Sequence, residues 1–320
     1  MQIYLVYSAT TPPRAEVIAV MQSAMIEGWG NPSSLHRWGA QAATVLETAR
    51  MQVAELIGAP SDGVVFTASG TEANNLAIMG VAQQYRQPRH MIISAVEHSA
   101  IANPIALLEQ WGWHITRLPV DRYGQVNPAD LAASLRQDTV LVSVINGQSE
   151  VGTLQPIIEL AAVLQTAENF ARPLFHTDAV QVAGRLPLNV RDLGVDLLSI
   201  SSHKLYGPQG AGALYVKPGT ELMPLLYGGG QENNLRSGTH AVPVIAGFGA
   251  AADLAIQELH QENQRLLRLR ERLIEQLQSH PELVLTGHPQ QRLPHHVSFY
   301  LPNADGQEDT RKNLVRKMNL

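Results

Sequence analysis

The sequence predicts an α/β protein with a mainly parallel, doubly wound sheet, followed by a smaller C-terminal domain. Short apolar runs alternate with helical runs through most of the 320 residues, which is the pattern of repeated βαβ units. The run 139–145 is predominantly apolar, as expected for a strand that is buried on both faces. Near Gly249 the alternation ends and a long, charged helical run begins, which indicates a second domain.

The spacing of apolar residues places the elements in order. Strands are predicted at 63–67, 90–94, 113–118, 139–145, 173–177, 195–200 and 213–216. Helices are predicted between them at 74–84, 101–111, 127–137 and 156–168. Beyond them come a helix at 250–280, strands at 283–285 and 296–300, and a helix at 311–320. We therefore expect a large domain over 14–250 and a small domain that combines 1–13 with 251–320.

Composition limits the partners and the chemistry. The formal net charge is −5 and basic residues form no run, which disfavours nucleic acid and anionic membranes as partners. The N-terminus lacks the basic start of a signal peptide, and no apolar stretch approaches the roughly 20 residues of a membrane helix. We therefore expect a soluble, cytoplasmic protein. The chain has no cysteine, which excludes disulfides, thiolate metal sites and a cysteine nucleophile on these residues.

Lys204 is the residue that points most clearly to a reaction. It follows the strand 195–200 and precedes the glycine-rich turn 207–212, so it is predicted at the end of a buried strand. Burial favours the neutral amine, which is a nucleophile for aldehydes. Asp178 ends another strand about one βαβ step earlier. Pyridoxal phosphate (PLP) needs such a pair, because the amine forms a Schiff base and the carboxylate keeps the ring nitrogen protonated.

Other polar residues also fall at strand ends, and each has an ordinary structural interpretation. The Ser69–Glu72 segment could cradle a phosphate, or it could simply be a capped helix start. His98 could stack on a flat ring or lie in a surface loop. Gln181 could reach a ring hydroxyl beside Asp178, or Asp178 could be a helix N-cap with an exposed glutamine nearby. Taken alone, Lys204 could equally be a surface lysine.

A metal site is disfavoured, because its candidate ligands His176, Asp178 and His203 lack compact ligand spacing. What favours one cofactor site is a coincidence of position. All the candidates fall at the carboxyl ends of predicted parallel strands, where open α/β sheets bind their ligands.

The chain resembles a cysteine desulfurase of the class V aminotransferase group, within the fold-type I PLP-dependent enzymes. The resemblance rests on motifs that keep their order and spacing from end to end: Tyr4-Leu5-x-Tyr7-Ser8-Ala9-Thr10-Thr11-Pro12, Asn31-Pro32-Ser33-Ser34-Leu35-His36, Thr71-Glu72-x-Asn74-Asn75, Glu97-His98, Glu150-x-Gly152-Thr153-x-Gln155-Pro156, Asp178-x-x-Gln181, Ser201-x-His203-Lys204-x-Tyr206-Gly207-Pro208 and Gly228-Gly229-Gly230-Gln231-Glu232-x-x-x-Arg236-Ser237-Gly238-Thr239. It implies a mainly parallel seven-stranded sheet in the large domain, an incomplete α+β small domain, and a homodimer.

The resemblance also implies roles for single residues. Lys204 is expected to form the Schiff base, His98 to stack on the ring and Asp178 to hold the ring nitrogen. The other implied cofactor-binding residues are Gly70, Thr71, Ser149, Gln181, Ser201, His203 and Thr239. Of these, Thr239 would reach the phosphate of the neighbouring subunit. Asn31 and Arg236 are the implied substrate-binding residues, and no metal is implied.

The implied reaction converts L-cysteine to L-alanine and passes the sulfur, through an enzyme persulfide, to acceptor or scaffold proteins for iron–sulfur cluster or thiolated-cofactor assembly. In the family the persulfide forms on a cysteine loop that follows a helix resembling 313–320, and an arginine that clamps the substrate carboxylate lies later still. We therefore expect a C-terminally truncated, impaired desulfurase. Two smaller departures are Val6, where the family has an acidic residue, and Ser149, where it has an asparagine.

Two other functions stay open on the sequence. A PLP-dependent cysteine or selenocysteine lyase would eliminate sulfide without a cysteine nucleophile. A non-catalytic dimer partner or scaffold in sulfur transfer would keep the fold without turnover.

Overall fold

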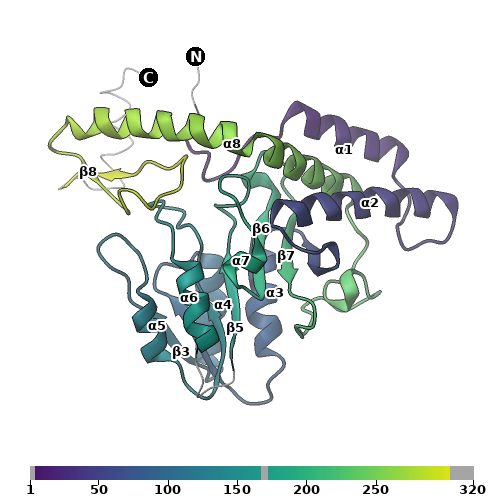
Figure 1. Ribbon diagram of the computed structural model, residues 1–320. Helices are drawn as coiled ribbons and strands as arrows, with labels where there is room; N and C mark the ends of the chain where they lie inside the picture. Colours follow the sequence, from purple (N-terminus) through teal and green to yellow (C-terminus); the bar gives the residue numbers. More distant parts are fainter. Residues whose placement is uncertain (1–3, 167–171, 303–320) are drawn as a thin grey trace.

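The computed structural model describes residues 4–166 and 172–302. Figure 1 shows a central sheet with helices on its faces and a long helix, α8 (Val242–Gln278), running across one end. The sheet has seven strands in the order β1-β7-β6-β5-β4-β2-β3. Their bounds are β1 (Val64–Thr67), β2 (His90–Ser94), β3 (His114–Leu118), β4 (Thr139–Ser143), β5 (Leu174–Asp178), β6 (Leu197–Ser201) and β7 (Gly212–Val216).

Most of the sheet is parallel. β3, β2, β4, β5 and β6 pair in parallel, whereas β7 pairs antiparallel with both β6 and β1. Strands β1, β2, β6 and β7 are buried along their whole length, which requires cover on both faces. The predicted mainly parallel α/β sheet is therefore confirmed, and each predicted strand of this sheet is present.

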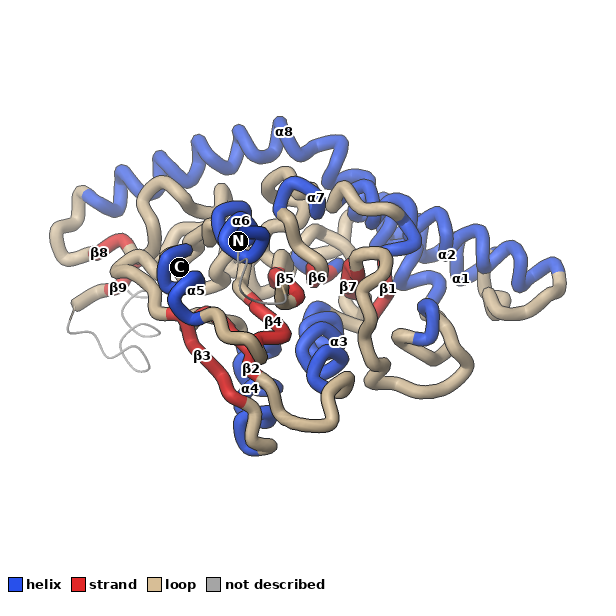
Figure 2. The backbone as a smooth tube through the Cα atoms, turned by 60° about the horizontal axis from the view of Figure 1, so that its bottom comes forward, coloured by secondary structure: helices blue, strands red, loops and turns tan. Residues whose placement is uncertain are grey.

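Each strand of the sheet contributes side chains to two separate hydrophobic cores, one on each face of the sheet. In β2, Ile92 belongs to one core and its neighbours Met91 and Ile93 to the other, as alternating side chains require. One core is covered by α3 (Gly70–Ala82) and α4 (Ser99–Gln110). The opposite core is covered by α5 (Pro128–Ser134), α6 (Ile157–Thr166), α7 (Val190–Leu193) and parts of α2 (Arg37–Leu56) and α8, an arrangement that Figure 2 shows from another side.

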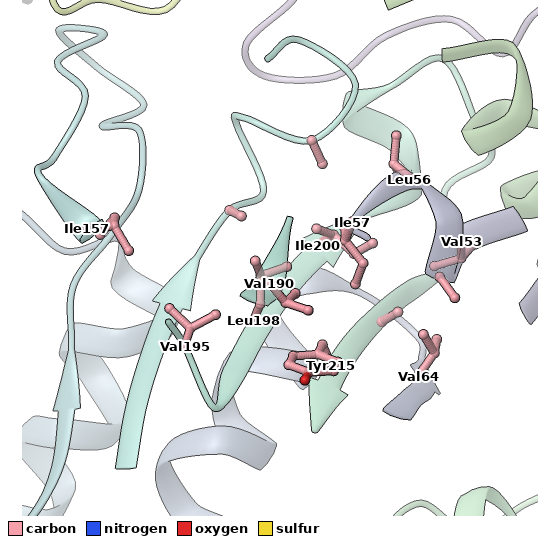
Figure 3. Packing of buried hydrophobic residues seen from close by; sticks show 14 of the residues in the cluster. Val53, Leu56, Ile57, Val64, Ile157, Val190, Val195, Leu198, Ile200 and Tyr215 are labelled. Carbon is pink, nitrogen blue, oxygen red and sulfur yellow. The ribbon is translucent and has the colours of Figure 1, made fainter. Parts of the chain in front are cut away.

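Figure 3 shows part of this second core. Val53 and Leu56 of α2, Ile200 of β6 and Tyr215 of β7 belong to it, and all of these side chains are buried. Burying such side chains stabilises the fold by roughly 1.5–3 kcal/mol each. The sheet on which the strand ends are arranged is thus held rigidly from both sides.

Helices α1 (Ala15–Glu27) and α2 lie outside the elements predicted from the sequence. α1 has no side-chain cap at Arg14, and several of its apolar residues are exposed, so it presents no single apolar stripe: Ile18, Val20, Met25 and Ile26. α2 is capped by His36, whose Nδ1 accepts a hydrogen bond from the Gly39 N–H at 3.1 Å, and histidine is not a usual cap.

Both helices pack along α8 (Figure 1). The predicted helix 250–280 is therefore present, but it begins earlier, at Val242, with Pro243 in its first turn where proline is tolerated. The predicted domain boundary at 250 falls inside this one continuous helix. The buried residues of α8 end at Ala252, so the beginning of the helix belongs to the core of the large domain.

α8 also corrects an expectation about hydropathy. A window of 18 residues in this helix has a mean hydropathy of 1.3, so its length and composition would suffice for a membrane helix. The expectation that no stretch comes close was wrong, because it considered uninterrupted apolar runs rather than averages. In that window 44% of residues are buried, and α8 packs on α1 and α2, as the core helix of a folded domain does.

A small two-stranded sheet follows α8. β8 (Val284–Leu285) pairs antiparallel with β9 (Phe299–Tyr300), inside the two predicted strand ranges. β9 is shorter than predicted because the preceding segment turns back onto a loop of the large domain, where the Leu293 N–H donates to the Gly152 carbonyl at 2.8 Å. The helix predicted at 311–320 lies outside the described residues.

Candidate active site

The candidate active site is a cavity of about 410 Å³ at the carboxyl ends of the strands. Its walls come from the segments that follow β1, β2, β4, β5 and β6, and from the N-terminal segment: Ser8, Ala9, Ser69, Gly70, Thr71, Asn74, His98, Ile145, Ser149, Asp178, Val180, Gln181, Ser201, His203 and Lys204. The structure thus brings most of the predicted site residues into one space, as the strand-end argument expects.

Lys204 ends the short helix η2 (Ser202–Lys204), which directly follows β6. Its Nζ donates hydrogen bonds to the backbone carbonyls of Ser8 at 2.6 Å and Ala9 at 2.8 Å. Burial lowers the pKa of Lys204, and the charge of Asp178 opposes this shift. A lowered pKa favours the neutral amine, which is the form that attacks an aldehyde.

The N-terminal segment reaches Lys204 because it is bonded to the chain on both sides of the lysine. The N–H and Oγ1 of Thr11 both donate to the His203 carbonyl, each at 2.9 Å. The Tyr206 N–H donates to Thr11 Oγ1 at 2.7 Å, and His203 Nδ1 lies 3.0 Å from Thr10 Oγ1. These bonds close one wall of the cavity with residues that are far apart in the sequence.

Asp178 is the last residue of β5 and is only 4% exposed. Burial raises the pKa of its carboxyl group. Two hydrogen bonds oppose this rise, from the Val180 N–H to Oδ1 at 2.9 Å and from Asn74 Nδ2 to Oδ2 at 2.6 Å. The carboxyl group is therefore held in one orientation by neutral donors, and a cationic ligand beside it would favour its ionised form.

Gln181 and Ser149 both line the cavity, and each also makes a hydrogen bond within the chain. Gln181 donates its Nε2 to the Ser8 carbonyl at 2.9 Å and so helps to hold the N-terminal segment. The Ser149 carbonyl accepts a hydrogen bond from His296 Nε2 at 3.0 Å, which ties this loop to the segment before β9. The expected contacts of these two residues to a ring hydroxyl stay predictions.

The first turn of α3 has the features of a phosphate cradle. Ser69 caps the helix by accepting from the Glu72 N–H at 3.1 Å, and the positive end of the helix faces the cavity at Gly70 and Thr71. A Cβ at position 70 would lie 2.8 Å from Val180 Cγ2, so glycine keeps this approach open.

A second observation supports the same assignment. Ser201 Oγ is buried beside Gly70 and has no hydrogen-bond partner among the described residues. A buried hydroxyl without a partner costs free energy, which an acceptor oxygen of a bound phosphate would recover. The residues around the cavity therefore fit PLP: Lys204 for the aldehyde, Asp178 for the ring nitrogen, and this cradle for the phosphate.

His98 lies at the cavity and at the start of a helix, and its stacking on a ring stays a prediction. Its Nδ1 caps α4 by accepting from the Ala100 N–H at 3.1 Å, and the residue also lines the cavity. The preceding residue, Glu97, accepts hydrogen bonds through Oε1 from the Ser94 hydroxyl and from the Ile145 N–H. Burial raises the pKa of Glu97 to about 8, so a neutral carboxyl group connects the ends of β2 and β4 behind His98.

Three predicted residues lie outside this cavity. Asn31 is in the turn between α1 and α2, where its Oδ1 accepts from the Ser33 N–H at 3.0 Å. Arg236 forms an ion pair with Glu72 at 2.8 Å, and Thr239 is exposed. Their implied contacts to substrate and to a neighbouring phosphate stay predictions.

His176 belongs to the interior of the sheet rather than to a metal site. Its Nδ1 lies 2.8 Å from Ser143 Oγ and its Nε2 lies 3.0 Å from Ser199 Oγ, so both ring nitrogens are occupied. Burial lowers the pKa of His176 to about 3. Within the described ranges, no group of three or more histidine, cysteine, aspartate or glutamate side chains is arranged to hold a metal ion.

Sequence reasoning assigned no role to three parts of this site. Asn74 lies four residues after Gly70 on α3, and that spacing was a usable signal because it puts both residues on one helix face. Glu97 stands beside a histidine in a loop, where burial of a carboxyl group is not expected. The carbonyls of Ser8 and Ala9 carry no signal, since any residue offers a carbonyl.

Comparisons with known proteins give the same assignment. The model of the family Aminotransferase class-V matches residues 3–317. The cysteine desulfurase IscS of Dictyoglomus turgidum is 46% identical over 308 residues, which cover 96% of this chain and 77% of that protein. The human cysteine desulfurase is 39% identical over 310 residues, which cover 95% of this chain and 67% of that protein.

Solved structures agree with the sequences. A NifS-like protein superposes with a TM-score of 0.94 at 33% identity, covering 100% of this chain and 87% of the other. The structure of SspA in complex with cysteine gives a TM-score of 0.75 at 36% identity, covering 79% of this chain and 72% of the other. The fold-type I architecture and the dependence on PLP that the sequence implied are thereby confirmed. The chain therefore belongs to the class-V aminotransferase family of PLP-dependent enzymes, in the group of the cysteine desulfurases.

Proposed function

We propose that this chain is a PLP-dependent cysteine desulfurase that acts on L-cysteine. The observation that carries the proposal is the shared cavity of Lys204, whose pKa is lowered by burial, and Asp178, whose carboxyl group is buried at the end of β5. Relatives named cysteine desulfurase and a similar structure in complex with cysteine support the same substrate.

When bound, PLP supplies an aromatic ring that draws electron density from the α-carbon of an amino acid. Asp178, which lines the cavity, would hold a proton on the ring nitrogen, and the cradle at Gly70 and Ser201 would hold the phosphate. His98 lines the cavity where it would cover a face of the ring. Lys204 is the group that would take the proton from the α-carbon.

The N-terminal segment would complete this proton transfer. An amine that accepts a proton becomes an ammonium with three donors and no acceptor. The Ser8 and Ala9 carbonyls lie 2.6 Å and 2.8 Å from Lys204 Nζ, so they are placed to receive two of these donors. Gln181 fixes the Ser8 carbonyl in this position through its own hydrogen bond.

Sulfur transfer needs a thiol that these 320 residues do not contain. In a balanced reaction the carbon–sulfur bond of L-cysteine breaks, a thiol receives the sulfur as a persulfide, and L-alanine leaves. We propose that the chain alone is impaired in this step and that an added thiol can act as the sulfur acceptor. Transfer onward to iron–sulfur cluster or thiolated-cofactor assembly is part of the same proposal.

The absence of cysteine also supports a second candidate, a lyase that releases sulfide by elimination. Elimination yields sulfide, ammonia and pyruvate, whereas desulfuration yields alanine. Product analysis therefore distinguishes the two functions. A chain that binds PLP and gives neither product set would be a non-catalytic partner.

We further propose that the α1–α2 face binds a second copy of the chain. Large apolar side chains are exposed there, among them Trp29 and Trp38, which are 65% and 52% exposed and whose ring centres lie 6.3 Å apart. An exposed apolar surface of this kind marks an interface. Trp38→Glu should convert a dimer to a monomer in analytical ultracentrifugation, whereas Trp111→Glu, at the exposed tryptophan that follows α4, should not. A wild-type monomer would disprove the dimer.

The central experiment tests Lys204 without requiring sulfur transfer. The PLP-loaded protein should exchange the α-proton of L-cysteine for deuterium in deuterated water, as followed by NMR, and Lys204→Ala should abolish the exchange. Borohydride reduction should attach the cofactor covalently to Lys204, as detected by mass spectrometry of the peptide. Exchange that persists in Lys204→Ala, or a cofactor attached elsewhere, would show that the assignment is wrong.

A further inference from the structure

Glu72 places a negative charge at the phosphate cradle. It lies in the first turn of α3, and its Oε2 accepts from the Ala68 N–H at 2.8 Å. A carboxylate in this turn is favourable for the helix, but it competes with a phosphate dianion for the same positive helix end. Arg236 Nε donates to Glu72 Oε1 at 2.8 Å, so the arginine neutralises the charge at this point.

The segment that carries Arg236 needs an external support. Just before it lies the short helix η3 (Glu232–Asn234), in which Glu232, Asn233 and Asn234 have φ values of 49°, 56° and 67°. Residues with a Cβ rarely adopt this left-handed region, and three in succession are costly. Contacts outside the segment must therefore hold it in place.

Glu232 provides that support. Its side chain is 1% exposed, and Arg50 Nη1 and Nη2 donate to its two carboxylate oxygens at 2.7 Å and 2.8 Å. His240 Nε2 lies 2.5 Å from Oε1. Although burial alone would raise it, the hydrogen bonds of Arg50 and His240 lower the pKa of Glu232 to about 2.

The Arg50–Glu232 pair also covers the open edge of the sheet. β1 is an edge strand, and it leads directly into the cradle at Ser69. The Phe66 N–H donates to Glu232 Oε2 and Arg50 Nη1 donates to the Val64 carbonyl, both at 2.7 Å. Backbone groups that an edge strand leaves unpaired are thus bonded to the support of the Arg236 segment.

We propose that Arg236 is a positioning residue of the phosphate site. Supported through Glu232 and Arg50, it neutralises Glu72 and so leaves the helix end free to bind a phosphate dianion. The inference rests on the proposed function, because the phosphate is that of PLP. This role of Arg236 differs from the substrate contact that the resemblance implied, because its loss should weaken binding of the phosphate group alone.

The test compares PLP with pyridoxal, which has the same ring and aldehyde but no phosphate. Affinities of the purified chain for both are measured by absorbance titration. Arg236→Gln should weaken PLP binding roughly tenfold, the order expected for one uncompensated nearby charge, and leave pyridoxal binding unchanged. The double variant Glu72→Gln with Arg236→Gln should regain most of the PLP affinity, because the opposing charge is gone.

Two further variants sharpen the result. Glu232→Gln, which weakens the support, should also reduce PLP binding selectively. The matched control is Arg117→Gln, which breaks an exposed Arg117–Glu109 pair of 2.6 Å between β3 and α4 and should change neither affinity. Unchanged PLP binding in Arg236→Gln, equal losses for both ligands, or no recovery in the double variant would each overturn the inference. A wild-type chain that binds neither ligand would instead refute the proposed PLP function.

Discussion

Two buried acidic regions of this molecule have opposite electrostatics. At the strand ends, burial raises the pKa of Asp178 and lifts that of Glu97 to about 8, and their hydrogen-bond donors are amides and a hydroxyl. At the edge of β1, Arg50 and His240 surround Glu232 and its pKa is lowered to about 2.

This difference in charge compensation distinguishes a residue that supports the fold, Glu232, from a residue of the candidate active site, Asp178. Glu232 has its charge compensated within the chain, as a residue that fixes a loop should. Asp178 is compensated only in part, by hydrogen bonds from neutral donors and by the charge of Lys204 across the cavity, and burial still raises its pKa. A protein tolerates this cost where a ligand supplies further positive charge. The cavity is therefore electrostatically incomplete by itself, and a cationic ring nitrogen is what would complete it.

The largest effect is expected when the carboxyl group of Asp178 is removed from the site. Asp178→Ala should slow exchange of the cysteine α-proton by about two to four orders of magnitude, because losing one partner of a buried ion pair costs roughly 3–5 kcal/mol. NMR of the PLP-loaded protein in deuterated water measures the rate. Asp192→Ala, at an exposed aspartate of α7, is the control and should exchange normally. An unchanged rate in Asp178→Ala would remove the contrast between the two regions.

The next largest effect is expected when Glu232 loses its ion-pair partner Arg50. Arg50→Ala should lower the free energy of unfolding by about 3–5 kcal/mol, because it leaves the Glu232 carboxylate buried without its main partner. Urea denaturation followed by circular dichroism measures the change. Arg117→Ala at the exposed Arg117–Glu109 pair should cost about 0–1 kcal/mol. Equal losses in the two variants would mean that burial adds nothing to the Arg50 pair.

The pH dependence of stability should reveal Glu97. Its pKa is raised from 4.5 to about 8 in the folded chain, so the native state holds a proton that the unfolded state loses. The stabilising contribution is complete below pH 4.5 and is lost as the pH rises to about 8. Melting temperatures of Glu97→Gln should therefore fall less than those of the wild type over this range. Parallel curves would indicate that the carboxyl group is ionised.

The smallest expected effect concerns the cradle. Gly70→Ala would bring a methyl group to 2.8 Å from Val180 Cγ2 beside Ser201, while alanine itself favours helix by about 1 kcal/mol. We expect PLP affinity to fall several-fold with little change in the free energy of unfolding. Titration and denaturation of the same preparation measure both, and an unchanged affinity would place the phosphate elsewhere.

Much of the fold could be predicted because it depends on local periodicity. Each predicted strand of the large sheet is found, since apolar runs between helical runs leave few alternatives. α1 and α2 could not be predicted in the same way, because apolar residues such as Ile26 of α1 and Trp38 of α2 are exposed. The site was predictable where a residue follows a strand, as Asp178 and Lys204 do, and not where it depends on a distant contact.

The sequence by itself determined the order of the sheet strands and of the helices between them, the placement of Lys204 and Asp178 at strand ends, and the absence of a thiol, because these depend on residue type and spacing. Only the tertiary structure decided that the Ser8 and Ala9 carbonyls meet Lys204, and that Arg50 meets Glu232. Both contacts join residues far apart in the chain, and no local period records which distant backbone group or charge will be brought beside a given side chain when the sheet assembles.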